Sequence, residues 1–227
     1  MTFACRPEHW GIIPEPYPAA QLLPDWYKKL KQRVHPFGTK DSTVKRCAPF
    51  LDALSAGFII PLAADVEIFC EGDKITTSAR IEEKVIGFHD QFQVGEDMPQ
   101  PLKFSNFWQI QVPRGWSVLF VPPLNRPDSR FECFSGIVEC DKYTNLIHFP
   151  FTLKEKDFSG IIEQGTPLVQ AIPFKRKAVK ATSRVMTEGE IMELHRWSAK
   201  LNAHSSHYRD YIWKKESKCP FRGLFGL

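Results

Sequence analysis

The stretch FIIPLAADVEIFCEGDKITTSARI, residues 58–81, decides the fold class. It contains short apolar strands at 58–62 and 66–70 and a third strand at 75–81. The EGDK sequence at 71–74 has the composition of a hairpin turn between the last two. No part of the stretch has the length or the period of a helix. We therefore expect antiparallel β-structure to begin at residue 58.

Further strands of the same kind follow, with no helix-length interruption. Turns rich in proline and glycine separate them, at 113–115, 122–125 and 165–167. The expected strands are 85–92, 104–112, 117–121, 131–138, 146–151, 159–162 and 168–174. This pattern predicts a mainly β fold, an antiparallel jelly-roll or double-stranded β-helix (cupin-like) sandwich.

The two ends of the chain differ from this core. Five prolines before residue 25 predict an extended N-terminal arm. Short helices are expected from Pro24-Asp25 to His35-Pro36, and from Ala48 to Ala56 before Gly57. Thr187 and Glu190 have capping-box spacing and predict a C-terminal helix. We expect one domain over 1–227, made of an arm with short helices (1–57), a β core (58–176) and a C-terminal helix (187–214).

The composition is that of a globular protein: 43% of the 227 residues are hydrophobic and 13% are aromatic. A net charge of +4 does not require a polyanionic partner. The N-terminus lacks the apolar region of a signal peptide, no window is apolar enough to span a membrane, and the six cysteines include no CxxC pair. We expect a cytoplasmic protein with free thiols. P-loop, GxSxG and HExxH motifs are missing from the sequence, which argues against the enzyme classes that they mark.

Two histidines within expected strands, His89 and His148, form a candidate metal site. Metal sites in jelly rolls combine an early His-x-acid motif with a later histidine and leave positions open for substrate and oxygen. Asp90 and Gln91 are the remaining candidate ligands, but Gln91, which shares the face of His89 in a regular strand, is not a carboxylate. With Fe(II) or another divalent metal and 2-oxoglutarate, this site indicates an oxygenase-like enzyme. The alternative is that both histidines are structural.

The carboxylate of a co-substrate such as 2-oxoglutarate needs a cation, and Lys154 and Arg176 are the candidates. A separate set of aromatic and polar residues suits the binding of a sugar, a nucleobase or a peptide. Its members are Phe104, Asn106, Trp108, Gln109, Trp116, Asn125 and Arg126, and the main candidates among them are Trp108, Trp116, Asn125 and Arg126. The alternative is that the tryptophans fill the core, as aromatic residues usually do.

The sequence therefore leaves two functions open. One is the metal-dependent enzyme, and the other is a metal-free binding module that captures a small ligand, a nucleotide or a host protein. The basic run at 175–184 suits phosphate or a solvated connection between strand and helix. No motif of a nucleic-acid-binding fold accompanies this run, so nucleic acid is not the expected partner.

Several phrases, in one order, resemble an uncharacterised family from tailed phages and bacteria, known as a domain of unknown function. These are PDWYKKL (24–30), FLDA (50–53), GFIIP (57–61), PRGWSVLF (113–120), GIVE (136–139) and GTPLVQAIPFKR (165–176). The resemblance runs from about Pro16 to Arg176. It implies a phage or bacterial cytoplasmic protein, and it carries no activity and no catalytic residues.

Overall fold

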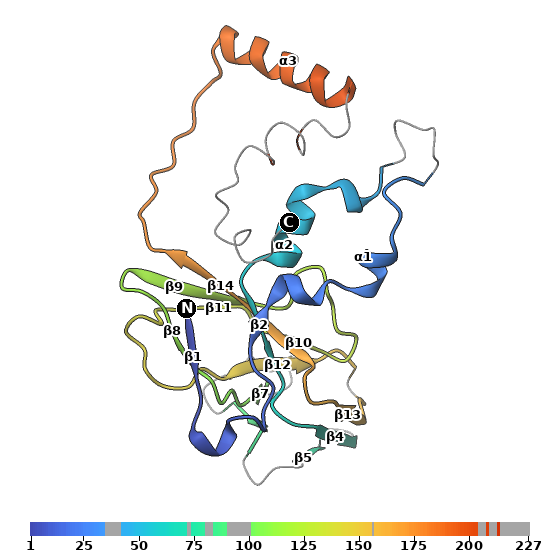
Figure 1. Ribbon diagram of the computed structural model, residues 1–227, viewed down its shortest axis with the longest axis vertical. Helices are drawn as coiled ribbons and strands as arrows, with labels where there is room; N and C mark the ends of the chain where they lie inside the picture. The colour runs from blue at the N-terminus through green and yellow to red at the C-terminus, as the bar shows by residue number, and fades with distance from the viewer. Residues whose placement is uncertain are drawn as a thin grey trace. The chain divides into compact units, whose positions relative to one another are not determined.

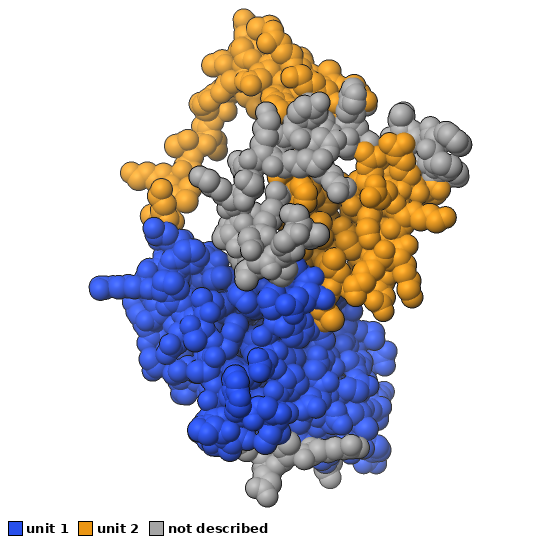
Figure 2. Space-filling view, viewed as in Figure 1, with its two compact units in different colours: residues 1–21, 56–176 blue, residues 22–55, 177–227 orange. Residues whose placement is uncertain are grey.

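The computed structural model describes residues 1–34, 42–71, 74–79, 84–89, 101–155, 157–203, 208 and 213. The chain forms two compact units (Figure 2). Unit 1 consists of Met1–Gln21 and Ala56–Arg176, and unit 2 consists of Leu22–Ser55 and Lys177–Leu227. The β core expected over 58–176 falls within unit 1. No helix in the described part of the chain is long and apolar enough to cross a bilayer.

Unit 1 is built from short antiparallel strands, and the mainly β fold is confirmed (Figure 1). The strands are β1 (Thr2–Ala4), β2 (Tyr17–Pro18), β3 (Phe58–Pro61), β4 (Val66–Glu71), β5 (Lys74–Ala79), β6 (Ile86–Phe88), β7 (Leu102–Phe104), β8 (Gln109–Gln111), β9 (Trp116–Val121), β10 (Phe131–Cys133), β11 (Gly136–Val138), β12 (Phe149–Leu153), β13 (Gly160–Ile162) and β14 (Pro167–Lys175).

The described strands form four sheets and no closed barrel. The sheets have the orders β11-β9-β14-β3-β2, β10-β12-β7-β6, β13-β4-β5 and β1-β8. The expected extended arm is a structural part of two of them. Thr2 pairs with Gln111 in the two-stranded sheet, and Tyr17 pairs with Ile59 at the edge of the five-stranded sheet. An extended, proline-bearing segment suits such edge positions because proline lacks the N–H that an inner strand needs.

Two strands that were expected to be continuous are each divided between sheets. The prediction of one strand over 104–112 is wrong because Asn106 forms a turn, with its side chain bonded to both the N–H and the carbonyl of Trp108 at 3.0 and 2.7 Å. The expected strand 131–138 likewise divides into β10 and β11. Of the expected strand 85–92, β6 covers 86–88, and residues 90–92 lie outside the described part.

Strand alternation separates a core face from an outer face in the four-stranded sheet. Leu102 and Phe104 of β7 are 2% and 0% exposed, and Phe104 stacks on Phe151 of β12 with ring centroids 3.8 Å apart. Successive residues of a strand point to opposite faces. Lys103, between these two core residues, is therefore on the outer face, which is where the cavity described below lies.

The described part of unit 2 contains three α-helices, α1 (Asp25–Lys29), α2 (Ala48–Ser55) and α3 (Glu188–Ala203). Helix α1 ends earlier than expected because Leu30 is already extended. The capping box of α3 is confirmed: Glu190 N–H donates to Thr187 Oγ1 at 3.3 Å, and Thr187 N–H donates to Glu190 Oε2 at 2.8 Å. The expected continuation of this helix to residue 214 lies largely outside the described residues. Single 3₁₀ turns occur at Pro7–His9, Ala19–Leu22 and Val44–Arg46.

Candidate functional site

His89 and His148 line the same cavity in unit 1. Its volume is about 420 Å³, and the other described lining residues are one cationic, one phenolic and three apolar side chains. These are Lys103, Tyr143, Val138, Leu146 and Ile147. The cavity therefore combines two imidazoles, one ammonium group and one phenol with an apolar wall.

Three neighbouring strands bring these groups together. Lys103 lies at the centre of β7, opposite Gly87 of β6 on one side and Pro150 of β12 on the other. His148 immediately precedes the buried Phe149, so alternation places it on the same outer face as Lys103. His89 follows the last residue of β6, and its N–H donates to the carbonyl of Pro101 at 3.0 Å. The register of β6, β7 and β12 thus juxtaposes residues 59 positions apart in the sequence.

The environment of His148 disfavours a charged imidazole. Burial lowers the pKa of His148 below its ordinary value, and the positive charges of Lys103 and His89 lower it further. The N–H of Asn106 donates to Nδ1 of His148 at 3.3 Å. A neutral imidazole that accepts at Nδ1 carries its proton at Nε2. His148 therefore presents an N–H donor at Nε2.

The described part of this cavity does not complete the expected metal site, which stays a prediction. A metal bonds to a ring nitrogen through its lone pair, but in His148 one nitrogen accepts a hydrogen bond and the other carries the proton. Lys103 places a positive charge in the same cavity. Among the described residues, no group of three or more His, Cys, Asp or Glu side chains is arranged to hold a metal ion. The candidate ligands Asp90 and Gln91 lie outside the described part of the chain.

Lys154 does not line the cavity of the histidines. It lines a second cavity of about 390 Å³, together with Asn125 and Arg126. Its Nζ donates to the carbonyl of Asp128 at 2.7 Å and lies 3.8 Å from a carboxylate oxygen of Glu132. Lys154 and His148 therefore line different cavities, although they are only six positions apart in the sequence.

The second cavity is close to electrical balance. Two carboxylates, Asp128 and Glu132, accompany the cations Arg126 and Lys154 in its lining. Arg126 donates from Nη2 to the carbonyl of Ala19 at 2.8 Å, and burial lowers its pKa. The charged groups of this cavity thus serve contacts within the protein.

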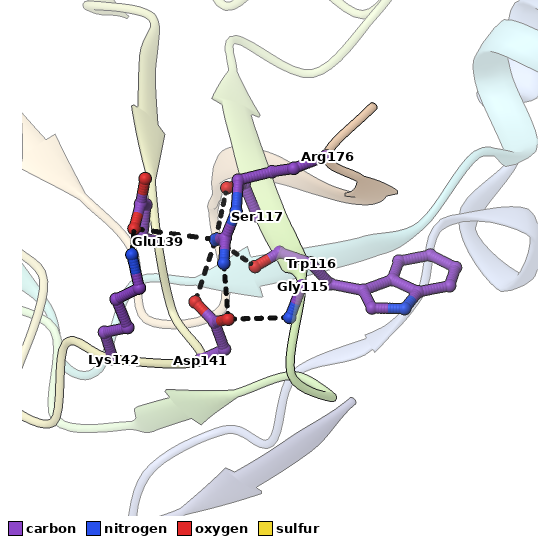
Figure 3. Close-up of polar contacts among 7 residues, drawn as sticks. All are labelled: Gly115, Trp116, Ser117, Glu139, Asp141, Lys142 and Arg176. Atoms are coloured by element: carbon purple, nitrogen blue, oxygen red, sulfur yellow. Dashed lines mark hydrogen bonds and ion pairs between the residues drawn. The ribbon is translucent and has the colours of Figure 1, made fainter. Parts of the chain in front are cut away.

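Arg176 is bound to a carboxylate of the protein itself (Figure 3). Its Nη1 and Nη2 donate to Oδ1 and Oδ2 of Asp141 at 2.8 and 2.5 Å, which is the bidentate geometry of a strong ion pair. Nη1 also donates to the carbonyl of Trp116 and to Ser117 Oγ. These contacts hold the end of β14 against β9 and the turn after β11. The guanidinium that was expected to bind a co-substrate carboxylate therefore already has a carboxylate partner.

The two tryptophans of the aromatic set have different environments. Trp108 is 4% exposed, and its Nε1 donates to the carbonyl of Pro14 at 3.1 Å, so it is a core residue. Trp116 is half-buried at the start of β9, and its indole points away from the polar cluster around Arg176 (Figure 3). Neither indole shares a cavity with Asn125 and Arg126. The set expected from the sequence is thus distributed over separate places.

Sequence analysis did not single out Lys103 or Tyr143, which line the histidine cavity. The sequence does contain a pattern that points to Lys103, because it is a lone charged residue between two apolar, core-facing residues of a strand. Tyr143 has no comparable signal because it lies in the connection between β11 and β12.

No family model matches this chain, and no curated protein matches its sequence. Similar solved structures include two dUTPases of staphylococcal phages. A mutant dUTPase of Staphylococcus bacteriophage 80alpha, bound to dUpNHpp, has 10% identity and a TM-score of 0.32, covering 70% of this chain and 83% of that one. A mutant dUTPase of phage phi11 of S. aureus has 10% identity and a TM-score of 0.33, covering 83% and 99%. Similarity at this level assigns neither a common fold nor an activity.

Proposed function

We propose that unit 1 is a jelly-roll binding module and that the cavity of His89, Lys103 and His148 holds a small anion, a carboxylate or a phosphate. One observation carries this proposal. The cavity gathers two imidazoles and an ammonium group, and no carboxylate is among the described residues that line it. Lys103 is half-buried and has no ion-pair partner among the described residues. A half-buried cation that lacks an internal partner favours an anion from solution.

Each polar group in the cavity has a distinct part in holding the anion. Lys103 supplies a full positive charge. His148 donates a hydrogen bond from Nε2 while neutral, because Asn106 occupies Nδ1. The hydroxyl of Tyr143 is a further donor on the wall. The apolar side chains of Leu146 and Ile147 form a further part of the wall, against which an apolar part of the ligand can pack.

This proposal is the metal-free binding module that the sequence left open as an alternative. It also retains the phage or bacterial cytoplasmic protein that the family resemblance implies. The ligand is then a small anionic compound in the cytoplasm of a bacterium or an infected cell. The oxygenase-like alternative needs Fe(II) or a related metal, and it is tested by elemental analysis of protein purified without chelator. We expect less than stoichiometric metal, whereas one tightly bound metal ion per chain would favour the oxygenase and contradict the anion site.

The direct test is calorimetric titration of the full chain with inorganic phosphate and with acetate. Lys103→Gln is expected to weaken binding by about tenfold or more, the loss that removal of one charge-assisted hydrogen bond produces. Lys154→Gln is the matched control, since it removes a lysine from the other cavity. Equal affinities of wild type and Lys103→Gln, or a loss confined to Lys154→Gln, would overturn the assignment of the site.

A further inference from the structure

A third cavity in unit 1 adjoins the proposed anion site. Its volume is about 450 Å³, and its lining contains two further basic residues, Arg6 and His9. The other members of the lining are Ala4, Cys5, Phe107, Gln109, Thr144, Asn145 and Leu146. No carboxylate is among the lining residues that the structure describes. The chain thus has a second basic cavity that the proposed function leaves unused.

One short segment of chain separates the two basic cavities. Leu146 lines both of them, Tyr143 lines the histidine cavity, and Thr144 and Asn145 line the other. The side-chain amide of Gln109 donates to the carbonyl of Thr144, which fixes the segment against β8. The cavities are therefore neighbours on either side of residues 143–146, with an apolar side chain in common.

We infer that the two cavities form one elongated site for a ligand with two anionic groups joined by an apolar spacer. This inference rests on the proposed function and specifies its ligand class. One anionic group contacts Lys103 and the histidines, the spacer crosses Leu146, and the second anionic group contacts Arg6. Dicarboxylates with an anionic group at each end, and bisphosphates of similar length, have this chemistry.

The surroundings of Arg6 suit the second contact. Its side chain is 66% exposed, and its nearest carboxylate is that of Glu8 at 3.9 Å. An exposed ion pair at this distance is weak, so the guanidinium is available to a ligand. Its planar geometry binds carboxylate and phosphate through two parallel hydrogen bonds. His9 is 8% exposed and packs edge-on against Phe107, which gives this end of the site a fixed wall.

A site with two contacts has a thermodynamic signature that a single contact lacks. Once the first anionic group is bound, the second contact becomes intramolecular and gains an effective concentration set by the length of the spacer. The affinity for dicarboxylates should therefore pass through a maximum as the spacer lengthens. A single-contact site binds all of these compounds with nearly the affinity of acetate.

The experiment is calorimetric titration with acetate, succinate, adipate and suberate. We expect one dicarboxylate to exceed acetate by about tenfold or more. Arg6→Gln should abolish this gain, so that the dicarboxylates then bind with nearly the affinity of acetate. Arg114→Gln, an exposed arginine outside the lining of both cavities, is the matched control, and thermal unfolding establishes that each variant is folded.

The outcomes separate this inference from the proposed function. Binding that depends on Lys103 but shows no maximum with chain length, and no effect of Arg6→Gln, overturns the two-contact site while the single anion site stands. A maximum that Arg6→Gln and Arg114→Gln reduce equally also overturns it. Binding of inorganic phosphate but of none of these four compounds overturns the two-contact site and leaves the single anion site standing. Binding of neither phosphate nor any of the four compounds overturns both proposals.

Discussion

Arg176 donates hydrogen bonds to both carboxylate oxygens of Asp141, at 2.8 and 2.5 Å, and so links the end of β14 to the turn after β11. The side chain of Asp141 is 2% exposed, while that of Arg176 is 28% exposed. Asp141 also accepts the N–H of Gly115 at 2.8 Å. The chain that leaves this turn contributes the wall of the proposed anion site, from Tyr143 to His148. The ion pair therefore fixes one end of the segment that forms the cavity.

Replacing Arg176 by lysine should loosen this turn although the charge is kept. Lysine cannot form the bidentate contact, so the carboxylate of Asp141 loses one of its two donors from residue 176. We expect faster hydrogen exchange at the amide of Gly115, measured by NMR. Lys177→Arg, one position further along an exposed stretch, should leave that rate unchanged. Equal rates in wild type and Arg176→Lys would show that the turn does not depend on the guanidinium.

The same ion pair predicts a loss of stability in acid. Arg176 and the N–H of Gly115 hold the pKa of Asp141 well below its ordinary value of 3.8. A carboxyl group whose pKa is depressed by folding stabilises the native state above its unfolded pKa, and this stabilisation is lost as the pH falls from about 3.8 toward the folded value. Urea unfolding at a series of pH values should show this slope in the wild type. Asp141→Asn should show a smaller slope, and identical slopes would contradict the prediction.

Lys103 should control the ionisation of His148. The pKa of His148 is lowered by burial, by Lys103 and by His89, so Lys103→Gln should raise it toward 6.5. NMR titration of the ring resonances measures this change, and Lys154→Gln is the control. A bound anion should raise the same pKa, because negative charge stabilises the imidazolium. By linkage, affinity should then increase as the pH falls through the titration of His148. Affinity that decreases in this range would contradict the anion site.

Trp108 should act as a core residue. Its Nε1 donates to the carbonyl of Pro14, so Trp108→Phe removes the donor and leaves that acceptor unpaired. We expect a loss of about 1–3 kcal/mol in the free energy of unfolding, measured with urea. Trp26→Phe, at a position 47% exposed, should change it by less than about 0.5 kcal/mol. If Trp108→Phe is as stable as Trp26→Phe, the contact with Pro14 contributes nothing to the fold.

Two glycines give a matched test of a close backbone approach. Gly57 has φ +66°, and a Cβ there would lie 2.1 Å from the carbonyl oxygen of Ala171. Gly165 has φ +86° with nothing within 4 Å. Gly165→Ala should therefore cost only the backbone strain, about 1–2 kcal/mol. Gly57→Ala should cost clearly more in the free energy of unfolding, and equal losses would show that the Ala171 backbone moves away freely.

Much of the β-structure could be predicted because its signals are local. Apolar runs bounded by proline and glycine identify β3, β4, β9 and β14 to within a few residues. The division of 104–112 could not be predicted because the Asn106 turn depends on hydrogen bonds that an extended strand with the same residues would not form. The pairing of β1 with β8 joins residues more than a hundred positions apart, and periodicity carries no information on such partners.

The candidate site was predictable only in part for the same reason. Alternation within a strand indicates that His148 and Lys103, each next in sequence to a core residue, point to the outer face. It does not indicate that β12 and β7 are neighbours, which is what brings them into one cavity. For Lys154 the prediction failed in the other direction. Its closeness in sequence to His148 suggested that both serve one site, but the two residues line different cavities. The strand between them carries Lys154 to another cavity.

The position of β14 in the five-stranded sheet limits how that sheet can fold during synthesis. This strand pairs with β3 on one side and with β9 on the other, so it joins the two halves of the five-stranded sheet. Its residues, 167–175, are synthesised after all the other strands of this sheet. Until then β2 and β3 have no sheet to complete, and apolar strands with open edges must stay separate from one another. The five-stranded sheet of unit 1 therefore cannot assemble strand by strand in sequence order, because its central strand is the last of its five to be synthesised.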